Sequence, residues 1–354
     1  MSIHTSHISR RCLIAVATLS CLVGVTACGG TSGATNDTNA GDKSVTVYSA
    51  DGLGDWYKGE FADFTKKTGI KVQYVEAGSG EVVSRVAKEK TNTQADLMVT
   101  PPPFIQQATA QGLLESNVVK TDGIPADQRD KDGHWVPLVN NYLTMIRNTK
   151  SASKPEKWDD LLTATYSHKI QYSTPGQTGD GTALLVLLEE IVGKKQAMDY
   201  FAKLQSNNVG PSSSTGKLGP KVSSGELLVA NSDIQMAELA VKNDGVAYEP
   251  FFPADAQGTR STVALPYTMG VVAGAPHKDN AVKLADFLTS TDVQQAIPEK
   301  AMGMPGRTDV KPTGEAATML STALKGVKII HPDWDSIKDS LGDDLAAYKK
   351  VTDQ

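Results

Sequence analysis

The residues best suited to chemistry in this chain of 354 residues form one glycine- and threonine-rich stretch, 173–182, which reads Ser-Thr-Pro-Gly-Gln-Thr-Gly-Asp-Gly-Thr. A short run at 169–172 precedes it and a mostly apolar run at 183–192 follows it, so we expect a strand, a tight turn and a helix. The first turn of a helix has unpaired N–H groups and a partial positive charge, which favour phosphate, phosphonate, sulfate or carboxylate. An ordinary strand-to-helix turn capped by Thr178 or Asp180 is the alternative.

Recognisable catalytic motifs are missing from the sequence. Histidine is the usual general base, but no histidine lies in a His-Glu-x-x-His motif, and there is no Gly-x-Ser-x-Gly motif. The neighbours of four histidines are typical of loops and surfaces: His134, His168, His277 and His331. The segment 210–217 resembles a phosphate-binding P-loop only superficially, because five residues rather than four separate its glycines. We therefore expect no enzyme, and a phosphonate hydrolase is the less favoured alternative.

The N-terminal region predicts an exported protein. Two arginines precede an uncharged apolar segment, 12–27, which at about 16 residues is shorter than the roughly 20 that span a membrane. We interpret residues 1–27 as a signal peptide and residues 28–43, which are small and polar, as a flexible tether. The ending Val-Thr-Ala-Cys resembles the lipobox of bacterial lipoproteins, which implies that Cys28 is lipidated and anchors the chain to the outer face of the cell membrane. A periplasmic location is the alternative. Export by the general or the twin-arginine route stays open.

Composition limits the cofactors and partners. All three cysteines lie in the signal segment or at its end, so the mature chain has no disulfide, no cysteine metal cluster and no thiol nucleophile beyond the anchor. We expect neither a metal nor another cofactor. The formal net charge is −5, and removal of the signal would make it more negative. This balance argues against a nucleic-acid partner, which would require a basic face.

The mature chain is long enough for two lobes built on parallel α/β sheets. Strand-like runs at 45–48, 70–75 and 96–99 each end in a loop rich in glycine or proline. Ligands gather at the carboxyl ends of such strands, where this chain places Asp51, Ser79, Gly80 and Glu81. Two lobes of this kind suit the capture of a small polar solute in the cleft between them. A surface adhesion lipoprotein, which would have no saturable small ligand, is a competing interpretation.

Several segments resemble the extracellular solute-binding proteins of ABC importers, in the group that contains ferric-ion, polyamine and phosphonate binders. These segments are the lipobox, 45–52, 158–162, 225–226 and 285–290. Within this group, 2-aminoethylphosphonate-binding proteins are the most similar at 48–57, 78–85, 213–218 and 230–236. The resemblance implies a type II periplasmic-binding-protein fold, with two α/β lobes and a ligand cleft at a two-strand hinge. It also implies a monomer that binds a small phosphonate and delivers it to ABC permease subunits.

The same resemblance implies discontinuous lobes. We place the crossing strands near 140–147 and 245–252. The expected organisation is then a first N-lobe part at 44–140, a C-lobe at 141–247, an N-lobe return at 248–300, and C-terminal helices that pack on the C-lobe at 301–354.

The residues after Asn231 favour an amine over iron. Ferric binders of this group carry a Tyr-Tyr pair after the corresponding strand, whereas this chain has Ser232, Asp233 and Ile234. An acidic Asp233 suits a cationic amine better than an oxyanion, and a polyamine has no use for an anion cradle. Both features together suit a ligand with a charge at each end, such as 2-aminoethylphosphonate. Ferric-ion, polyamine and other oxyanion binding are the alternatives.

The predicted site therefore has a phosphonate half and an ammonium half. The phosphonate half consists of N–H groups and side chains at Thr178, Gly179, Asp180, Gly181, Thr182, Ser214, Thr215, Ser79 and Gly80. The ammonium and the ethylene linker would contact Asp51, Glu81, Asp233, Glu249, Tyr48 and Tyr248. Each of these residues also has a structural alternative, as a first-turn carboxylate of a helix, a turn former or a core aromatic residue.

Overall fold

A computed structural model describes residues 43–353. The predicted signal peptide, the lipidated Cys28 and the tether up to residue 42 lie outside the described residues. Within 43–353, no helix is long and apolar enough to cross a membrane.

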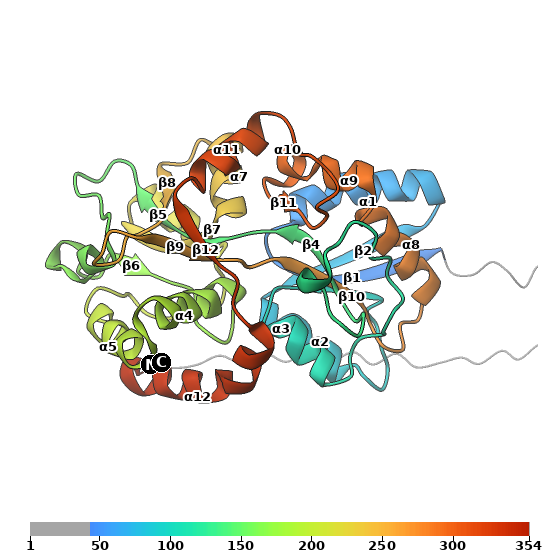
Figure 1. Ribbon diagram of the computed structural model, residues 1–354, viewed down its shortest axis with the longest axis horizontal. Coiled ribbons are helices and arrows are strands. Elements are labelled where there is room, and N and C mark those ends of the chain that lie inside the picture. The colour runs from blue at the N-terminus through green and yellow to red at the C-terminus, as the bar shows by residue number, and fades with distance from the viewer. Residues whose placement is uncertain (1–42, 354) are drawn as a thin grey trace, which may run out of the picture. The chain divides into compact units, whose positions relative to one another are not determined.

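Two main β-sheets organise the chain, and the larger one forms the N-lobe (Figure 1). β1 (Ser44–Ala50) pairs in parallel with β2 (Lys71–Ala77) and with β3 (Leu97–Thr100), which confirms the three strands predicted in this part of the chain. The sheet continues from β3 through β10 (Tyr267–Val271) and β4 (Val136–Asn140) to β11 (Met304–Pro305), all antiparallel. Late segments of the sequence therefore complete the first lobe.

Amphipathic helices cover the N-lobe sheet. The i, i+4, i+7 spacing of Tyr57, Phe61 and Phe64 places all three on the buried face of one helix, and the rings of Tyr57 and Phe61 stack with their centroids 4.7 Å apart. The helices of this lobe are α1 (Gly54–Thr68), α2 (Ser79–Lys88), α3 (Phe104–Ala110), α8 (Lys278–Leu288), α9 (Thr291–Gln295) and α10 (Ile297–Ala301).

The smaller sheet forms the C-lobe. Its strand order is β6 (Ile170–Gln171), β7 (Val229–Asp233), β5 (Leu143–Asn148) and β8 (Tyr248–Phe251). The stretch 173–182 leads from β6 into α4 (Gly179–Val192), as predicted, and residues 183–188 of that helix are all buried. The remaining helices are α5 (Lys194–Leu204), α6 (Leu218–Ser224) and α7 (Ile234–Asp244), and short 3-10 helices occur at Ala126–Gln128, Trp158–Leu162 and Ala164–Tyr166.

Two extended segments connect the lobes. The first joins β4 to β5 through Asn141 and Tyr142 and matches the expected crossing near 140–147. The second joins β9 (Arg260–Val263) to β10 through residues 264–266, so the expected crossing at 245–252 and the N-lobe return from residue 248 are wrong. β8 pairs with β5 inside the C-lobe sheet. An apolar extended run produces the same sequence signal in a sheet strand as in a crossing, which explains the error.

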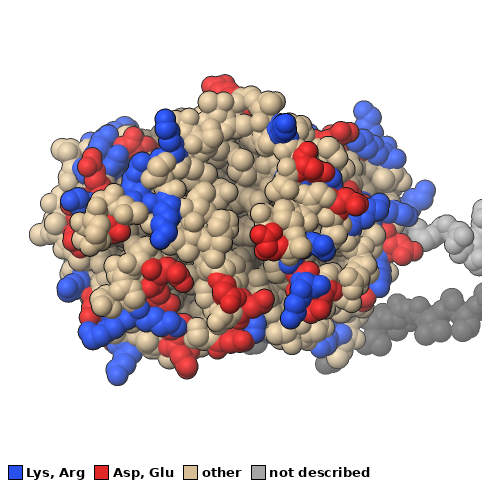
Figure 2. All heavy atoms as spheres, viewed as in Figure 1, with Lys and Arg blue, Asp and Glu red and all other residues tan. Residues whose placement is uncertain are grey.

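The C-terminal region contacts both lobes and is not confined to the C-lobe. After α11 (Glu315–Ala323), β12 (Val327–Ile330) pairs in parallel with β9. α12 (Trp334–Thr352) packs against α5 of the C-lobe and also against α3 of the N-lobe. The hydroxyl groups of Tyr348 and Tyr172 lie 2.9 Å apart and connect α12 to the C-lobe core. On the face in Figure 2, basic and acidic side chains of the described residues are interspersed, as is usual for a soluble surface.

The close approach of α4 to the preceding turn depends on a glycine and can be tested. A Cβ atom at Gly181 would collide with the backbone of Ser173, whereas a Cβ atom at Gly59 of α1 would meet nothing within 4 Å. We expect Gly181→Ala to lower the free energy of unfolding by about 1–3 kcal/mol, as overpacking does. The matched change Gly59→Ala should raise it by about 0.5–1 kcal/mol, because alanine is the better helix former. Urea unfolding of both variants measures the difference, and an equal effect of the two changes would contradict this packing.

Candidate functional site

A small cavity lies between the lobes, at the carboxyl ends of strands from both sheets. Its volume is about 10 Å³, which is room for about one water molecule. Both lobes and both crossing segments contribute to its lining, which consists of Ala50, Asp51, Ser79, Pro101, Asn141, Gly179, Asp180, Asp233, Leu265 and Tyr267. The cavity therefore occupies the position that the sequence predicts for a ligand cleft.

Hydrogen bonds cross the cleft and hold the lobes together. The backbone N–H of Gly179 donates to Ser79 Oγ at 3.2 Å, and Ser214 Oγ donates to Asp51 Oδ2 at 3.0 Å. Farther along the cleft, Gln235 Nε2 donates to the carbonyl oxygen of Gly52 at 3.1 Å. The structure is thus a closed arrangement of the two lobes.

Three carboxylates meet in this cavity without a basic partner. Asp180 and Asp233 are only 7% and 1% exposed, and no lysine or arginine is among the described residues that line the cavity with them and Asp51. Burial raises the pKa of Asp51 and raises the pKa of Asp233 to about 6. Burial and the charge of Asp233 raise the pKa of Asp180 well above its usual range. Asp180 Oδ1 also has no hydrogen-bond partner, so the cavity favours a cation that can donate hydrogen bonds.

Contacts with the backbone and with the N-lobe sheet fix the position of Asp233. Its side chain caps α7, with Oδ1 accepting from the N–H of Met236 at 2.6 Å. Tyr267 contacts Oδ2 at 3.5 Å and donates to the carbonyl oxygen of Asp51 at 3.0 Å. Asn141, which lines the same cavity, accepts through its Oδ1 from the N–H of Gln235 at 3.2 Å. Tyr267, the first residue of β10, therefore contacts this carboxylate from the N-lobe sheet.

The predicted anion cradle at the start of α4 has its donors engaged within the protein. Thr178 caps the helix, since its Oγ1 accepts from the N–H of Gly181 at 3.0 Å. Thr182 Oγ1 donates to the carbonyl oxygen of Thr178 at 2.7 Å, and the N–H of Gly179 is bonded to Ser79 as described above. Ser79 belongs to the first turn of α2, so two helix N-termini face each other here. The serine hydroxyl occupies the acceptor position that an oxygen of an anion would take between them.

Hydroxyl groups from the 210–217 loop lie beside this region. Thr215 Oγ1 donates to Ser173 Oγ at 3.0 Å, and Ser214 is bonded to Asp51. Gly80 lies against the backbone of Gln177, with its N–H 3.4 Å from the carbonyl oxygen. These predicted residues surround the cavity without lining it.

Four residues of the predicted ammonium half are not among those that line the cavity. Glu81 is exposed in the first turn of α2, and Glu249 forms ion pairs with Arg147 at 2.9 Å and Lys154 at 3.3 Å. Tyr48 is buried in the N-lobe core with its hydroxyl on Glu89, and Tyr248 is buried in the C-lobe core.

Sequence reasoning missed Tyr267, Asn141, Leu265 and Pro101. Asn141 and Leu265 lie on the crossing segments, and Tyr267 is the first residue of β10. Which face of each meets the cleft depends on pairing between residues more than 100 positions apart, as in the bond from the N–H of Leu265 to the carbonyl oxygen of Asn141. Pro101 follows β3 and was visible only as part of a proline-rich loop at the sheet edge.

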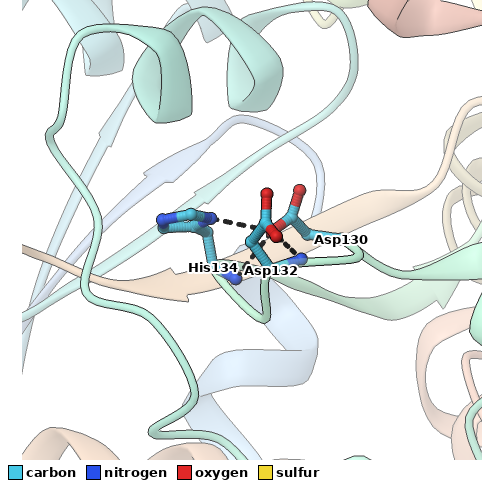
Figure 3. A group of neighbouring side chains, drawn as sticks. All are labelled: Asp130, Asp132 and His134. Carbon is cyan, nitrogen blue, oxygen red and sulfur yellow. Dashed lines mark hydrogen bonds and ion pairs between the residues drawn. The ribbon is translucent and has the colours of Figure 1, made fainter.

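A second group of ionisable residues, Asp130, Asp132 and His134, lies in the segment just before β4 (Figure 3). It is the one set within residues 43–353 that brings three possible metal ligands within 4.8 Å of one another. Asp130 Oδ2 already accepts from the N–H groups of Asp132 and His134 at 3.0 Å and lies 2.7 Å from His134 Nδ1. This carboxylate closes a loop, and we assign it no metal.

The fold and the cleft identify the class of protein. The chain belongs to the bacterial extracellular solute-binding proteins, since the model of that family matches residues 50–295. Such proteins bind a small molecule and serve ABC import, and the family and its relatives act in transport. A protein of Salmonella typhimurium provisionally named as a 2-aminoethylphosphonate-binding periplasmic protein is 47% identical over 316 residues, which cover 87% of this chain and 92% of the relative.

Solved structures support the fold. The periplasmic binding protein AfuA from Actinobacillus pleuropneumoniae, determined with fructose-6-phosphate bound, gives a TM-score of 0.76 at 20% identity and covers 88% of this chain and 99% of its own. The ferric binding protein from Campylobacter jejuni gives a TM-score of 0.71 at 21% identity, and the match covers 87% of this chain and 99% of that protein. At these identities the two structures show the fold alone, and they confirm the predicted periplasmic-binding-protein fold with two α/β lobes.

Burial of Asp233 has a consequence for stability that depends on pH. Because its pKa is raised to about 6, its folded form binds a proton more readily than its unfolded form. The stability of the ligand-free protein should therefore fall as the pH rises from about 4 to about 6. We expect Asp233→Asn to raise the free energy of unfolding at pH 7.5 by about 1–3 kcal/mol, because asparagine also caps helices and carries no charge.

A matched control separates this charge effect from helix capping. Asp333 caps α12 by accepting from the N–H of Ser336 at 3.2 Å, at an exposed position. Asp333→Asn should leave the pH dependence of urea unfolding unchanged. Two results would contradict the interpretation of a buried uncompensated charge. One is a lower free energy of unfolding for Asp233→Asn than for the original protein at pH 7.5. The other is an unchanged dependence of the free energy of unfolding on pH between pH 4 and 6 in that variant.

Proposed function

We propose that this chain captures 2-aminoethylphosphonate in the cleft between its lobes and delivers it to an ABC import permease. The observation that carries the proposal is the meeting of three carboxylates beside two helix N-termini. Asp180 and Asp233 are buried and Asp51 is half-buried, and no lysine or arginine is among the described residues that line the cavity with them. A ligand with an ammonium group at one end and a phosphonate at the other complements both features. The name of the Salmonella relative supports the same ligand.

The ammonium group would lie among Asp51, Asp180 and Asp233. Its three N–H donors could satisfy the free oxygen of Asp180 and the outward oxygens of the other two carboxylates. Asp180, which the sequence suggested for the phosphonate half, belongs to this half in the proposal, because its carboxylate is buried with those of the other acids. Burial and the neighbouring carboxylates raise the pKa of the Tyr267 hydroxyl, which thus stays protonated beside the amine.

The phosphonate would lie between the N-termini of α2 and α4. One of its oxygens would replace Ser79 Oγ as acceptor from the N–H of Gly179, and the serine hydroxyl would then donate to the ligand. The hydroxyl groups of Ser214 and Thr215 are within reach of a small rearrangement. Charge-assisted bonds of this kind are roughly twice as strong as neutral ones, and the helix termini add a favourable field.

Binding would require the lobes to separate and close again. A cavity of about 10 Å³ cannot hold 2-aminoethylphosphonate, so the ligand would enter an open cleft and the lobes would close around it. In this proposal residues 1–27 direct export, Cys28 anchors the chain to the membrane, and the closed monomer is the form that the permease recognises. The ligand needs no metal in this arrangement.

Other ligands of the same fold match the cavity less well. A ferric ion would require several anionic ligand atoms close together, and the three carboxylates are not among the described groups that bring three ligand atoms within 4.8 Å. A polyamine would leave the helix N-termini without an anion. Inorganic phosphate would leave the carboxylates without a cation, and an unpaired buried charge is strongly unfavourable. A hydrolase would release phosphate, which a simple assay detects.

Calorimetric titration with matched ligands tests the proposal. We expect 2-aminoethylphosphonate to bind at least 100-fold more tightly than ethylphosphonate, which differs only by the loss of the amine, and more tightly than phosphate, putrescine or ferric citrate. Asp233→Asn should weaken 2-aminoethylphosphonate at least 10-fold and leave ethylphosphonate unchanged or improved, because a buried repulsion is removed. Equal affinity for 2-aminoethylphosphonate and ethylphosphonate in the original protein would contradict the proposal.

A further inference from the structure

The acidic groups of the cleft have no positive partner among the groups around them. Asp180 and Asp233 are buried, Asp51 is half-buried, and no lysine or arginine is among the described residues that line their cavity. The cavity has room for about one water molecule, so the solvation of three negative charges in it is poor. The other titratable groups that interact electrostatically with these carboxylates are neutral or negative: Glu76, Tyr74, Tyr248 and Tyr267.

The hydrogen bonds of the cleft leave one oxygen of Asp180 and one of Asp233 poorly satisfied. Asp180 Oδ1 is buried and has no hydrogen-bond partner. Asp233 Oδ1 accepts from the N–H of Met236 at 2.6 Å, but Oδ2 lies 3.5 Å from the hydroxyl of Tyr267. That hydroxyl has one hydrogen to donate, and it is closer to the carbonyl oxygen of Asp51, at 3.0 Å. Two acceptor oxygens then face each other, and a proton on the carboxyl group would remove their repulsion.

We propose that Asp180 and Asp233 hold a proton between them in the ligand-free protein, and that the ammonium group of the ligand displaces this proton to the solvent. The N–H groups of the ammonium then take the place of the proton at the two carboxylates. The raised pKa values of both side chains support a shared proton, because two acids this close titrate as a pair. The inference rests on the proposed function for the identity of the ligand and adds how the same site is regulated.

Proton exchange makes recognition of the amine depend on pH. At low pH both carboxyl groups are neutral, and the cleft has little preference for a cation. As the pH rises, binding of an amine becomes tighter because it releases a proton, whereas a phosphonate without an amine meets growing repulsion from the ionised carboxylates. A primary amine stays charged throughout, since its pKa is near the value of about 10.4 for lysine. Asp180 and Asp233 are therefore specificity-determining residues whose discrimination increases with pH.

The shared proton can be detected without a ligand, by ¹³C NMR of protein labelled at the aspartate carboxyl carbons. We expect the pair to hold at least one proton at about pH 6, where an ordinary aspartate with a pKa of about 3.9 is ionised. Spectra of Asp180→Asn and Asp233→Asn assign the two resonances, and the exposed Asp333 serves as the ionised reference. Full ionisation of both carboxyl groups at that pH would overturn the shared proton.

The exchange is tested by calorimetric titration at about pH 6 in phosphate-free buffers of different ionisation enthalpy. We expect 2-aminoethylphosphonate to release about one proton more than ethylphosphonate, which has the same phosphonate titration but no amine. The ratio of the two affinities should rise about tenfold per pH unit between about pH 5 and 6, as release of one proton requires. Asp180→Asn and Asp233→Asn, each checked for a cooperative thermal transition, should release less, and Asp333→Asn should behave like the original protein.

The outcomes separate this inference from the proposed function. Binding of 2-aminoethylphosphonate with no more protons released than by ethylphosphonate, or with a ratio of affinities that does not change with pH, would overturn the exchange and leave the proposed function standing. If 2-aminoethylphosphonate does not bind while the pair holds a proton at about pH 6, the proposed function and the exchange fail together and the shared proton stands.

Discussion

The structure depends on one electrostatic constraint, the enclosure of two buried carboxylates and one half-buried carboxylate between two lobes, with no lysine or arginine among the described residues that line their cavity. Desolvation of these groups is unfavourable and raises the pKa values of Asp51, Asp180 and Asp233. A cation at about 4 Å from one carboxylate gains about 4 kcal/mol at an effective dielectric constant near 20, whereas an exposed ion pair gains at most about 1 kcal/mol. A bound ammonium group would therefore remove a penalty that the ligand-free closed form retains.

The fold creates this arrangement by joining strand ends from both sheets. Asp51 follows β1 of the N-lobe, Asp233 ends β7 of the C-lobe, and Asp180 lies in the first turn of α4. Tyr267 of β10 connects two of them, because its hydroxyl contacts Asp233 Oδ2 and the carbonyl oxygen of Asp51. Movement of one lobe against the other would separate Asp51 from Asp180 and Asp233, so a cation bound among them would favour closure of the lobes.

Much of this could be predicted from the sequence where the signal is local. The turn at 173–182 opens α4 and Asp233 caps α7. Glycine, hydroxyl and carboxylate preferences at helix starts act over a few residues, so such features leave a local signal. The long-range features could not be predicted. Glu249 was assigned to the ligand but pairs with Arg147, and the contribution of Tyr267 depends on how a strand late in the chain enters the first sheet. The lipid anchor at Cys28 stays a prediction.

A crystal structure of the protein with 2-aminoethylphosphonate bound tests the central claim most directly. The account predicts an ammonium nitrogen within about 2.7–3.2 Å of carboxylate oxygens of Asp180 and Asp233, with the phosphonate oxygens on the N–H of Gly179 and the hydroxyl of Ser79. A ligand in the reverse orientation, with its phosphonate nearest Asp233, or a ligand bound outside the cleft, would contradict it.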